Sequence, residues 1–247
     1  MKVRTEPSQP TPQATRAARV AAGRLRRLAR AVAVGAGAAA ALLAIAVLVR
    51  QGWEPMIRLD EKAVLAGTQF ALARPALVDV LVAWQWAFEA KRLVVLVVAT
   101  ALVYRWRTGD ASRAWWSIGT VLAAWGLSNV AKELVQRARP VLDEPLSHAA
   151  GYSFPSGHAT NTAAMLTALV VLLWPVLRSR GARIAAVSGA ALLVVLTAVD
   201  RVLLGAHYPS DVVAGILFGA GFVLASYLGY LGWSPRHPHL DRREDTA

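Results

Sequence analysis

The chain has 247 residues, of which 56% are hydrophobic, and a formal net charge of +12. It contains no cysteine, which excludes disulfides, thiolate metal sites and cysteine nucleophiles. In a soluble protein this charge would suggest nucleic-acid binding. Here the basic residues stand mostly at the ends of long apolar blocks, as they do in membrane proteins. We therefore expect a protein embedded in the lipid bilayer, with no nucleic-acid partner.

The N-terminal segment 1–30 carries Pro and Thr and then a run of arginines, and we expect it to be a basic, disordered tail. The apolar block 31–49 follows, and its 19 uncharged residues exceed the ~7–15 of a signal-peptide core. This block is therefore predicted to be an uncleaved first membrane span.

Five further uncharged blocks predict transmembrane helices, at 93–104, 114–131, 159–177, 184–199 and 212–235. A crossing needs about 20 residues, so the second and fifth spans must include flanking arginines that reach the headgroups. Residues 60–90 mix charged residues with Leu, Val and Trp, which suits interfacial amphipathic helices. The predicted fold is all-α, with about six transmembrane helices and interfacial helices between spans one and two. The membrane domain covers 31–233, and 234–247 form a C-terminal tail.

The distribution of basic residues predicts the orientation in the membrane. With six spans, the two termini and the loops at 105–113 and 178–183 share one side, which holds 17 basic residues against 10 on the other. The positive-inside rule makes the first side cytoplasmic. The loops 132–158 and 200–211 then face outward from the cytoplasm.

Three short motifs fall on that outer side. The first runs from Lys132 to Arg139 and Pro140 at the end of span three. On a helix, Lys132 and Arg139 share a face two turns apart, and Pro140 disfavours helical backbone at Arg139. Taken alone, these cations are best interpreted as interface anchors.

The second motif is Pro155–Ser156–Gly157–His158, which opens span four. Ser156 is a candidate helix N-cap, and Gly157 lets a ligand approach the backbone. The free amides of a helix start form an anion site. A nucleophilic Ser156 is disfavoured, because no G-x-S-x-G elbow surrounds it.

The third motif contains Arg201, His207 and Asp211, between spans five and six. Asp211 follows His207 by four residues, so its carboxylate can accept a hydrogen bond from one imidazole nitrogen and leave the other free to attack. The alternatives are an ordinary i,i+4 helix pair and a metal site. Three cations argue against a metal ion and for a multivalent anion. Gathered on one membrane face, the three motifs suit phosphoryl transfer.

Together, the motifs resemble the three-part signature of the type 2 phosphatidic acid phosphatase family, with matching spacing, over residues 55–232. The resemblance implies a helical bundle that hydrolyses a lipid phosphate or pyrophosphate without metal or cofactor. It implies that His207 forms a phosphohistidine, that Asp211 orients it and that His158 serves as acid and base. The phosphate ligands implied are Lys132, Arg139, Arg201, Ser156 and Gly157.

One residue departs from the family pattern, because Asp200 stands where the family usually has Ser. A carboxylate beside a phosphate pocket weakens binding unless it pairs with Arg201 or points away. The resemblance leaves the lipid open, and undecaprenyl pyrophosphate is our first candidate, ahead of phosphatidylglycerol phosphate and phosphatidate. By resemblance, we expect the plasma membrane of a bacterium as the location.

Three other functions have to be weighed. Vanadate-dependent haloperoxidases share the fold but are typically soluble, which the six predicted spans argue against. A lipid phosphotransferase shares the first half-reaction and is harder to separate from a hydrolase. A non-catalytic lipid-phosphate binding or transport protein would need the cations but not His207, Asp211 and His158.

Overall fold

The computed structural model describes residues 12–142, 146–147 and 150–233. Across these ranges the regular structure is α-helical, and no strand occurs in them. The helices are α1 (Pro12–Arg50), α2 (Glu54–Leu72), α3 (Pro75–Ala87), α4 (Ala90–Thr108), α5 (Ala111–Val135), α6 (Gly157–Leu173), α7 (Arg180–Leu203) and α8 (Pro209–Trp233).

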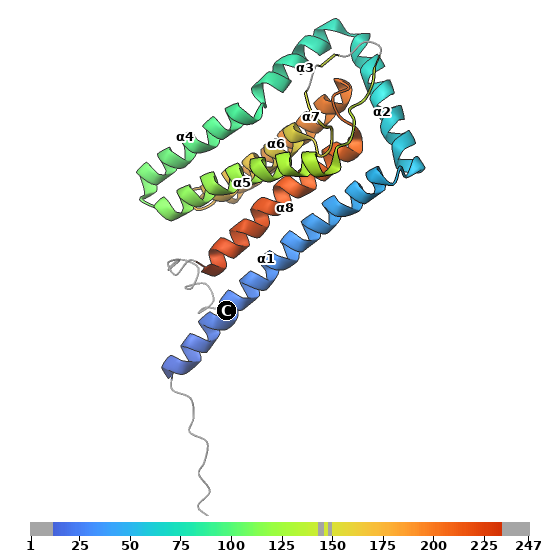
Figure 1. Cartoon of the computed structure of the whole chain (residues 1–247). Coiled ribbons are helices and arrows are strands. Elements are labelled where there is room, and N and C mark those ends of the chain that lie inside the picture. The colour runs from blue at the N-terminus through green and yellow to red at the C-terminus, as the bar shows by residue number, and fades with distance from the viewer. Residues whose placement is uncertain (1–11, 143–145, 148–149, 234–247) are drawn as a thin grey trace, which may run out of the picture.

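Helix α6 forms the centre of the bundle, and its side chains are mostly buried. It packs against α4, α5, α7 and α8, while α1 lies along α8 on the outside (Figure 1). Small residues allow these close approaches. A Cβ added at Gly219 would lie 2.3 Å from the carbonyl oxygen of Thr160, and one at Gly221 would lie 2.4 Å from Cβ of Ala38. Glycine is therefore required where α8 meets α6 and α1.

Local chemistry explains several helix ends. Gly109 ends α4 in the left-handed conformation, at φ 74°. Asp110 then caps α5 by accepting the amide of Arg113 at 3.0 Å. Ser179 caps α7 in the same way, accepting the amide of Ala182 at 3.0 Å. At its other end α5 stops at Gln136, which adopts φ 53°.

Each of the six predicted spans lies on a helix for most of its length, which confirms the all-α prediction, although the span 159–177 continues past the end of α6 and residues 234–235 of the last span lie outside the described residues. By length and composition, the described helices that can cross a membrane alone lie at Arg19–Arg50, Arg180–Leu203 and Pro209–Gly232. Helices α2 and α3, joined at a bend of 115°, would together make a fourth crossing if they form one broken span. The count of six therefore stays a prediction.

The segment between spans one and two contains two helices, α2 and α3, which meet in a sharp corner (Figure 1). Their place at the membrane interface remains a prediction. Helix α1 begins at Pro12, so residues 12–30, which we expected to be a disordered tail, are helical. Their many Ala and Arg residues explain this, because both have high helix propensity. Residues 1–11 and the predicted tail 234–247 lie outside the described residues.

Candidate active site

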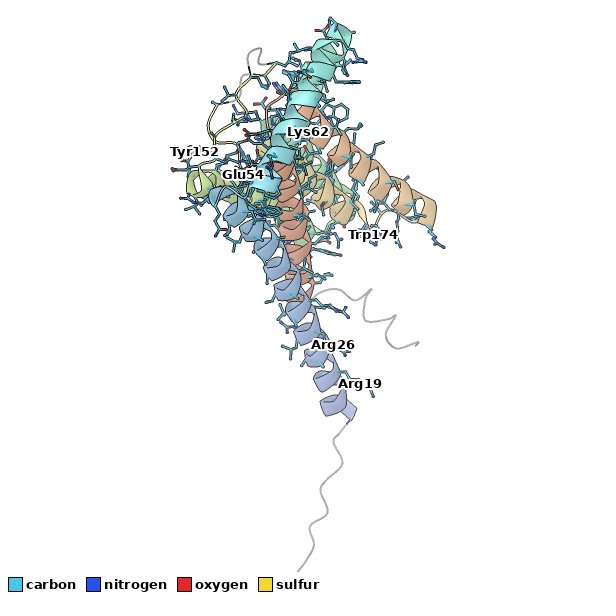
Figure 2. All side chains as sticks on the ribbon, turned by 90° about the vertical axis from the view of Figure 1, so that its right-hand side faces the viewer. Arg19, Arg26, Glu54, Lys62, Tyr152 and Trp174 are labelled. Atoms are coloured by element: carbon cyan, nitrogen blue, oxygen red, sulfur yellow. The ribbon has the colours of Figure 1, made fainter. Side chains whose placement is uncertain are left out.

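The three predicted motifs come together at one end of the bundle. There the loop between α5 and α6 meets the short connection between α7 and α8 and the α2–α3 corner (Figure 1). Figure 2 shows Tyr152, in the first of these loops, at the same end of the molecule as Glu54 of α2. Arg19 and Arg26 of α1 lie at the opposite end.

His207 lies in the connection between α7 and α8, with only 3% of its surface exposed. Its backbone amide donates to the carbonyl of Arg201 at 3.3 Å, and Gly205 makes the turn at φ 67°. The Nη1 atom of Arg139 lies 3.2 Å from His207 Nε2. Because a guanidinium can only donate, Nε2 must be the acceptor, and in the neutral ring the hydrogen is on Nδ1. The unprotonated nitrogen therefore faces the cations.

The Nδ1 side of His207 faces Asp211, but not in the way that we predicted. Its distance to Asp211 Oδ2 is 3.7 Å, too long for the direct hydrogen bond that we expected. Ser153 lies between the two groups, with Oγ 3.3 Å from Nδ1 and its hydroxyl donating to Asp211 Oδ2. Since α8 begins only at Pro209, His207 and Asp211 are not an i,i+4 pair within one helix.

Burial governs the protonation state of His207. It lowers the pKa of the imidazole to about 4, and the nearby Asp211 carboxylate offsets only part of this effect. The positive charges of Arg139 and Lys132 lower the pKa further. His207 is thus neutral at pH 7, the state in which Nε2 has a free electron pair.

Asp211 is fully buried and is held by an ion-pair network that the sequence did not reveal. Arg137 Nη1 lies 2.6 Å from Asp211 Oδ1, and its Nη2 lies 2.7 Å from Asp60 Oδ2. Asp60, on α2, also accepts the amide and the hydroxyl of Ser210. Burial lowers the pKa of Arg137, but the two carboxylates outweigh it and raise the pKa overall. Arg137 thus joins α2 to the start of α8.

The two cations of the first motif both reach the site. Lys132 Nζ donates to the carbonyl of Tyr152 at 2.9 Å, and its Cε lies 3.6 Å from where a Cβ on Gly157 would be. Arg139 lies beyond the end of α5 and binds backbone carbonyls, among them Ala206 at 2.8 Å and Gly151 at 2.9 Å. Helix α5 ends at Val135, whereas the position of Pro140 led us to expect its end near Arg139.

Arg201, at the end of α7, is almost completely buried. Its Nε donates to Asp200 Oδ2 at 2.7 Å, its Nη2 bonds the same oxygen, and its Nη1 donates to Gln85 Oε1 at 2.8 Å. Asp200 therefore pairs with Arg201, one of the two outcomes that we considered. The Gln85 carbonyl lies 3.2 Å from His158 Nε2. Gln85 thus links Arg201 and His158 to α3.

Ser156 occupies the N-cap position of α6, as predicted, but its hydroxyl does not cap the helix. Its Oγ is buried and has no hydrogen-bond partner in the described part of the chain. Lys132 lies against the first turn of α6, with Cε 3.6 Å and Nζ 4.0 Å from where a Cβ on Gly157 would be. The helix start and the Lys132 ammonium can together bind an anion through the helix dipole and charge.

All eight predicted site residues thus lie at one end of the bundle, and four further residues belong to the same network: Ser153, Arg137, Asp60 and Gln85. Sequence signals for these were weak. Arg137 and Ser153 stand inside or beside the motifs, and their roles could have been suspected from that position. Asp60 and Gln85 lie far away in sequence, within a segment that we read only as interfacial.

Comparisons with known proteins all point to one family. The PAP2 superfamily model matches residues 113–234. The lipid A 1-phosphatase of Rhizobium etli is 40% identical over 120 residues, which cover 45% of this chain and 47% of that protein. The decaprenylphosphoryl-5-phosphoribose phosphatase of Mycolicibacterium smegmatis is 35% identical over 161 residues, 63% of this chain and 81% of that protein. The match to the Rhizobium protein thus spans about half of that relative's length.

A solved structure matches the fold over most of its length. It is the crystal structure of a transmembrane PAP2-type phosphatidylglycerolphosphate phosphatase from Bacillus subtilis, with a TM-score of 0.69 and 22% identity. The alignment covers 79% of this chain and 97% of that one. At this identity the likeness concerns the fold, which is a transmembrane helical bundle.

Proposed function

Because the chain belongs to the PAP2 superfamily, we propose that it is a membrane phosphatase that hydrolyses a lipid phosphate or pyrophosphate through a phosphohistidine at His207. The observation that carries this proposal is the orientation of His207. Its Nε2 accepts from Arg139, a residue that can only donate, and its Nδ1 faces Ser153 and Asp211. A neutral, oriented imidazole among cations is what in-line attack on phosphorus requires.

The reaction begins when a phosphate enters and takes the Arg139 hydrogen bond away from Nε2. His207 Nε2 then forms a bond to phosphorus while the bond from phosphorus to the leaving oxygen breaks. The positive charge that develops on the imidazole is offset by the buried Asp211 carboxylate. The equatorial oxygens receive hydrogen bonds from Lys132 and Arg139 and from the amides that open α6.

His158 supplies the proton for the leaving oxygen. Its Nε2 lies 3.2 Å from the carbonyl of Gln85, which can only accept, so that nitrogen carries a hydrogen. His158 therefore acts as an acid in its imidazolium form, held beside the phosphate dianion: Nε2–H stays on the Gln85 carbonyl, and the Nδ1 hydrogen passes to the leaving oxygen, which leaves the ring neutral. After the leaving group departs, His158 takes a proton from water, and the resulting hydroxide cleaves the phosphohistidine to release inorganic phosphate.

The pairing of Asp200 with Arg201 sets the charge of the pocket. Arg201 uses three of its five hydrogens on Asp200 and Gln85, which leaves two for a phosphate oxygen. Its charge is balanced by Asp200, so the net attraction for phosphate comes mainly from Lys132 and Arg139. We propose that Arg201 still contributes hydrogen bonds in the transition state.

The lipid nature of the substrate is proposed from the relatives, whose names specify phosphates of membrane lipids. A separate apolar cavity of about 630 Å³ lies between α6, α7 and α8 toward the end of these helices away from the site, lined by Leu166, Val170, Trp174, Val194 and Leu224 among others. It can accept hydrocarbon but no charged group. We propose undecaprenyl pyrophosphate as the first candidate; the Mycolicibacterium smegmatis relative has a decaprenyl-linked phosphate in its name. Phosphatidylglycerol phosphate and phosphatidate remain the other candidates.

The orientation is also part of the proposal. The site lies at the end of the bundle opposite Arg19 and Arg26 (Figure 2), and the positive-inside rule places such a basic segment in the cytoplasm. We therefore propose a bacterial plasma-membrane protein with both termini inside and the active site outside. Labelling of single cysteines with a membrane-impermeant reagent at Tyr152 and at Arg19 tests this, since the natural chain has no cysteine.

The central experiment measures phosphate release from undecaprenyl pyrophosphate, phosphatidylglycerol phosphate and phosphatidate in detergent micelles with EDTA present. The wild type is expected to hydrolyse at least one of these lipids, and His207→Ala none of them. The control is Arg58→Met, which should match the wild type because the Arg58 side chain is 72% exposed. Hydrolysis by His207→Ala at the wild-type rate would exclude the mechanism. Phosphate transfer to an added alcohol in place of water would favour the phosphotransferase, and tight lipid binding without turnover would favour a binding protein.

A further inference from the structure

His207 Nδ1 and Asp211 Oδ2 lie 3.7 Å apart, and the role of the side chain between them rests on the proposed function. We infer that Ser153 is a positioning residue that couples these two groups by relaying a hydrogen bond between them. The Nδ1–H of His207 donates to Ser153 Oγ, and the hydroxyl of Ser153 donates to Asp211.

The direction of each bond follows from the donors and acceptors present. Arg139 donates to Nε2, so Nδ1 carries the hydrogen of the neutral ring. An ionised carboxylate can only accept, so the hydroxyl hydrogen of Ser153 must point to Asp211. The remaining lone pairs of Ser153 Oγ are then free to accept from Nδ1, 3.3 Å away. The opposite directions would leave two hydrogens or two lone pairs facing each other.

The rest of the structure holds Ser153 in this place. The residue is completely buried, and its amide donates to the carbonyl of Arg137 at 2.8 Å. Phe154, the next residue, is also fully buried and packs with Ala46 of α1 and Ala214 of α8. The loop at Ser153 is therefore fixed from both sides, and the hydroxyl has little freedom to leave the gap.

Asp211 is also occupied in a way that makes the relay necessary. Its Oδ1 accepts from Arg137 at 2.6 Å, and its Oδ2 accepts from the amide of Tyr208 at 3.0 Å and from Ser153. These bonds hold the carboxylate 3.7 Å from His207 Nδ1. Without the hydroxyl, Nδ1–H would face a gap, and once phosphate takes the Arg139 hydrogen bond from Nε2, no hydrogen bond would hold the ring in the tautomer that leaves Nε2 free.

The relay acts during the first chemical step. As Nε2 bonds to phosphorus and the leaving oxygen departs, the ring becomes cationic and its Nδ1–H becomes a stronger donor. The two hydrogen bonds in series shorten and transmit the negative charge of Asp211 to the ring. No proton leaves Nδ1, so the proton for the leaving oxygen still comes from His158. The relay therefore stabilises the transition state more than the free enzyme.

The test compares Ser153→Ala with Ser153→Thr, which keeps a hydroxyl. The matched control is Ser128→Ala, since Ser128 is also buried but its hydroxyl has no partner in the described part of the chain. With the lipid hydrolysed fastest by the wild type, Ser153→Ala is expected to lower kcat roughly ten- to hundredfold with KM nearly unchanged. Ser153→Thr is expected to recover most of kcat, and Ser128→Ala to leave it unchanged.

Two inhibitors separate positioning from a general loss of structure. Orthovanadate bonds to a histidine nitrogen as a transition-state mimic, whereas inorganic phosphate binds without a covalent bond. In Ser153→Ala, the Ki of vanadate should rise roughly tenfold, while the Ki of phosphate should change less than about twofold. Equal weakening of both would mean a structural role and would overturn the relay.

The failure of this inference differs from the failure of the proposed function. If Ser153→Ala keeps the wild-type kcat and vanadate Ki while His207→Ala is inactive, the relay is wrong and the phosphohistidine mechanism stands. If His207→Ala retains full activity, the proposed function itself is wrong, and the relay falls with it.

Discussion

Arg137 offers the sharpest test of the network around Asp211, and we expect Arg137→Met to destabilise the protein strongly. Its side chain is 9% exposed and binds two carboxylates that are exposed by 2% and 0%, Asp60 and Asp211. Methionine has a similar length but no charge, so both buried carboxylates lose their cation. Asp60 keeps its bonds to Ser210, but Asp211 Oδ1 loses the donor that Arg137 supplies.

The expected size follows from buried ion pairs in general. Removal of one partner typically costs about 3–5 kcal/mol, because a charge is left uncompensated. For a domain of this size, each kcal/mol lowers Tm by roughly 2–4 °C, so Arg137→Met should melt roughly 6–20 °C below the wild type. Thermal unfolding in detergent, followed by tryptophan fluorescence at one fixed scan rate, measures this difference. The variant should also lose activity, because Asp211 is no longer held in place.

Arg58→Met is the control for this experiment. Arg58 and its partner Glu54 are both 72% exposed and 3.9 Å apart, so its loss should cost at most about 0.5 kcal/mol. Arg137→Met combined with Asp60→Asn should recover part of the lost stability, since one uncompensated charge is removed. If Arg137→Met melts within about 2 °C of the wild type, the buried network does not carry the energy that we assign to it.

Three other substitutions and one pH titration have defined outcomes. Gly219→Ala places a methyl 2.3 Å from the Thr160 carbonyl oxygen, and the forced separation of α6 and α8 should cost about 1–3 kcal/mol. Gly189→Ala, with open space around its Cβ, should melt within a degree or two of the wild type. Asp200→Ser should lower the Ki of inorganic phosphate severalfold, because the neighbouring guanidinium gains net charge; an unchanged or higher Ki would refute this. In an NMR titration, the His207 ring of the folded protein should become protonated only near pH 4, whereas a histidine of the unfolded chain becomes protonated near pH 6.5. The free energy of unfolding should therefore fall as the pH drops from 6.5 towards 4. A titration midpoint of His207 near pH 6.5 would contradict the effect that we assign to burial.

The sequence was sufficient to predict the helices and the gathering of the three motifs at one end of the bundle. Long uncharged blocks permit little other than helix in a bilayer, where each backbone amide must be satisfied within its own segment. The motif residues stand at the ends of those blocks, so the predicted alternation of spans put Lys132, His158 and His207 on one face, and the structure brings them to one end of the bundle. Where residues 12–30 became helical, the prediction failed because Ala and Arg favour helix even outside an apolar block.

The details of the site depended on contacts that no local pattern records. The gap between His207 and Asp211 follows from the start of α8 at Pro209, and Ser153 fills it only because its loop is packed on both sides. Asp60 and Gln85 lie more than 70 residues from their partners in the network. Their polar side chains looked like the solvent face of an interfacial helix, since burial by a distant loop leaves no periodic signal.

The position of Gln85 determines which fragments of this protein can keep the site intact. Its side chain receives Arg201, its backbone carbonyl meets His158, and it belongs to α3. Asp60, on α2, likewise completes the network around Asp211. Both residues lie outside 113–234, the region that the family model matches. The three motifs therefore do not make up a self-sufficient site: a fragment cut to the matched region would keep every motif residue and lose the two side chains that tie the site to α2 and α3.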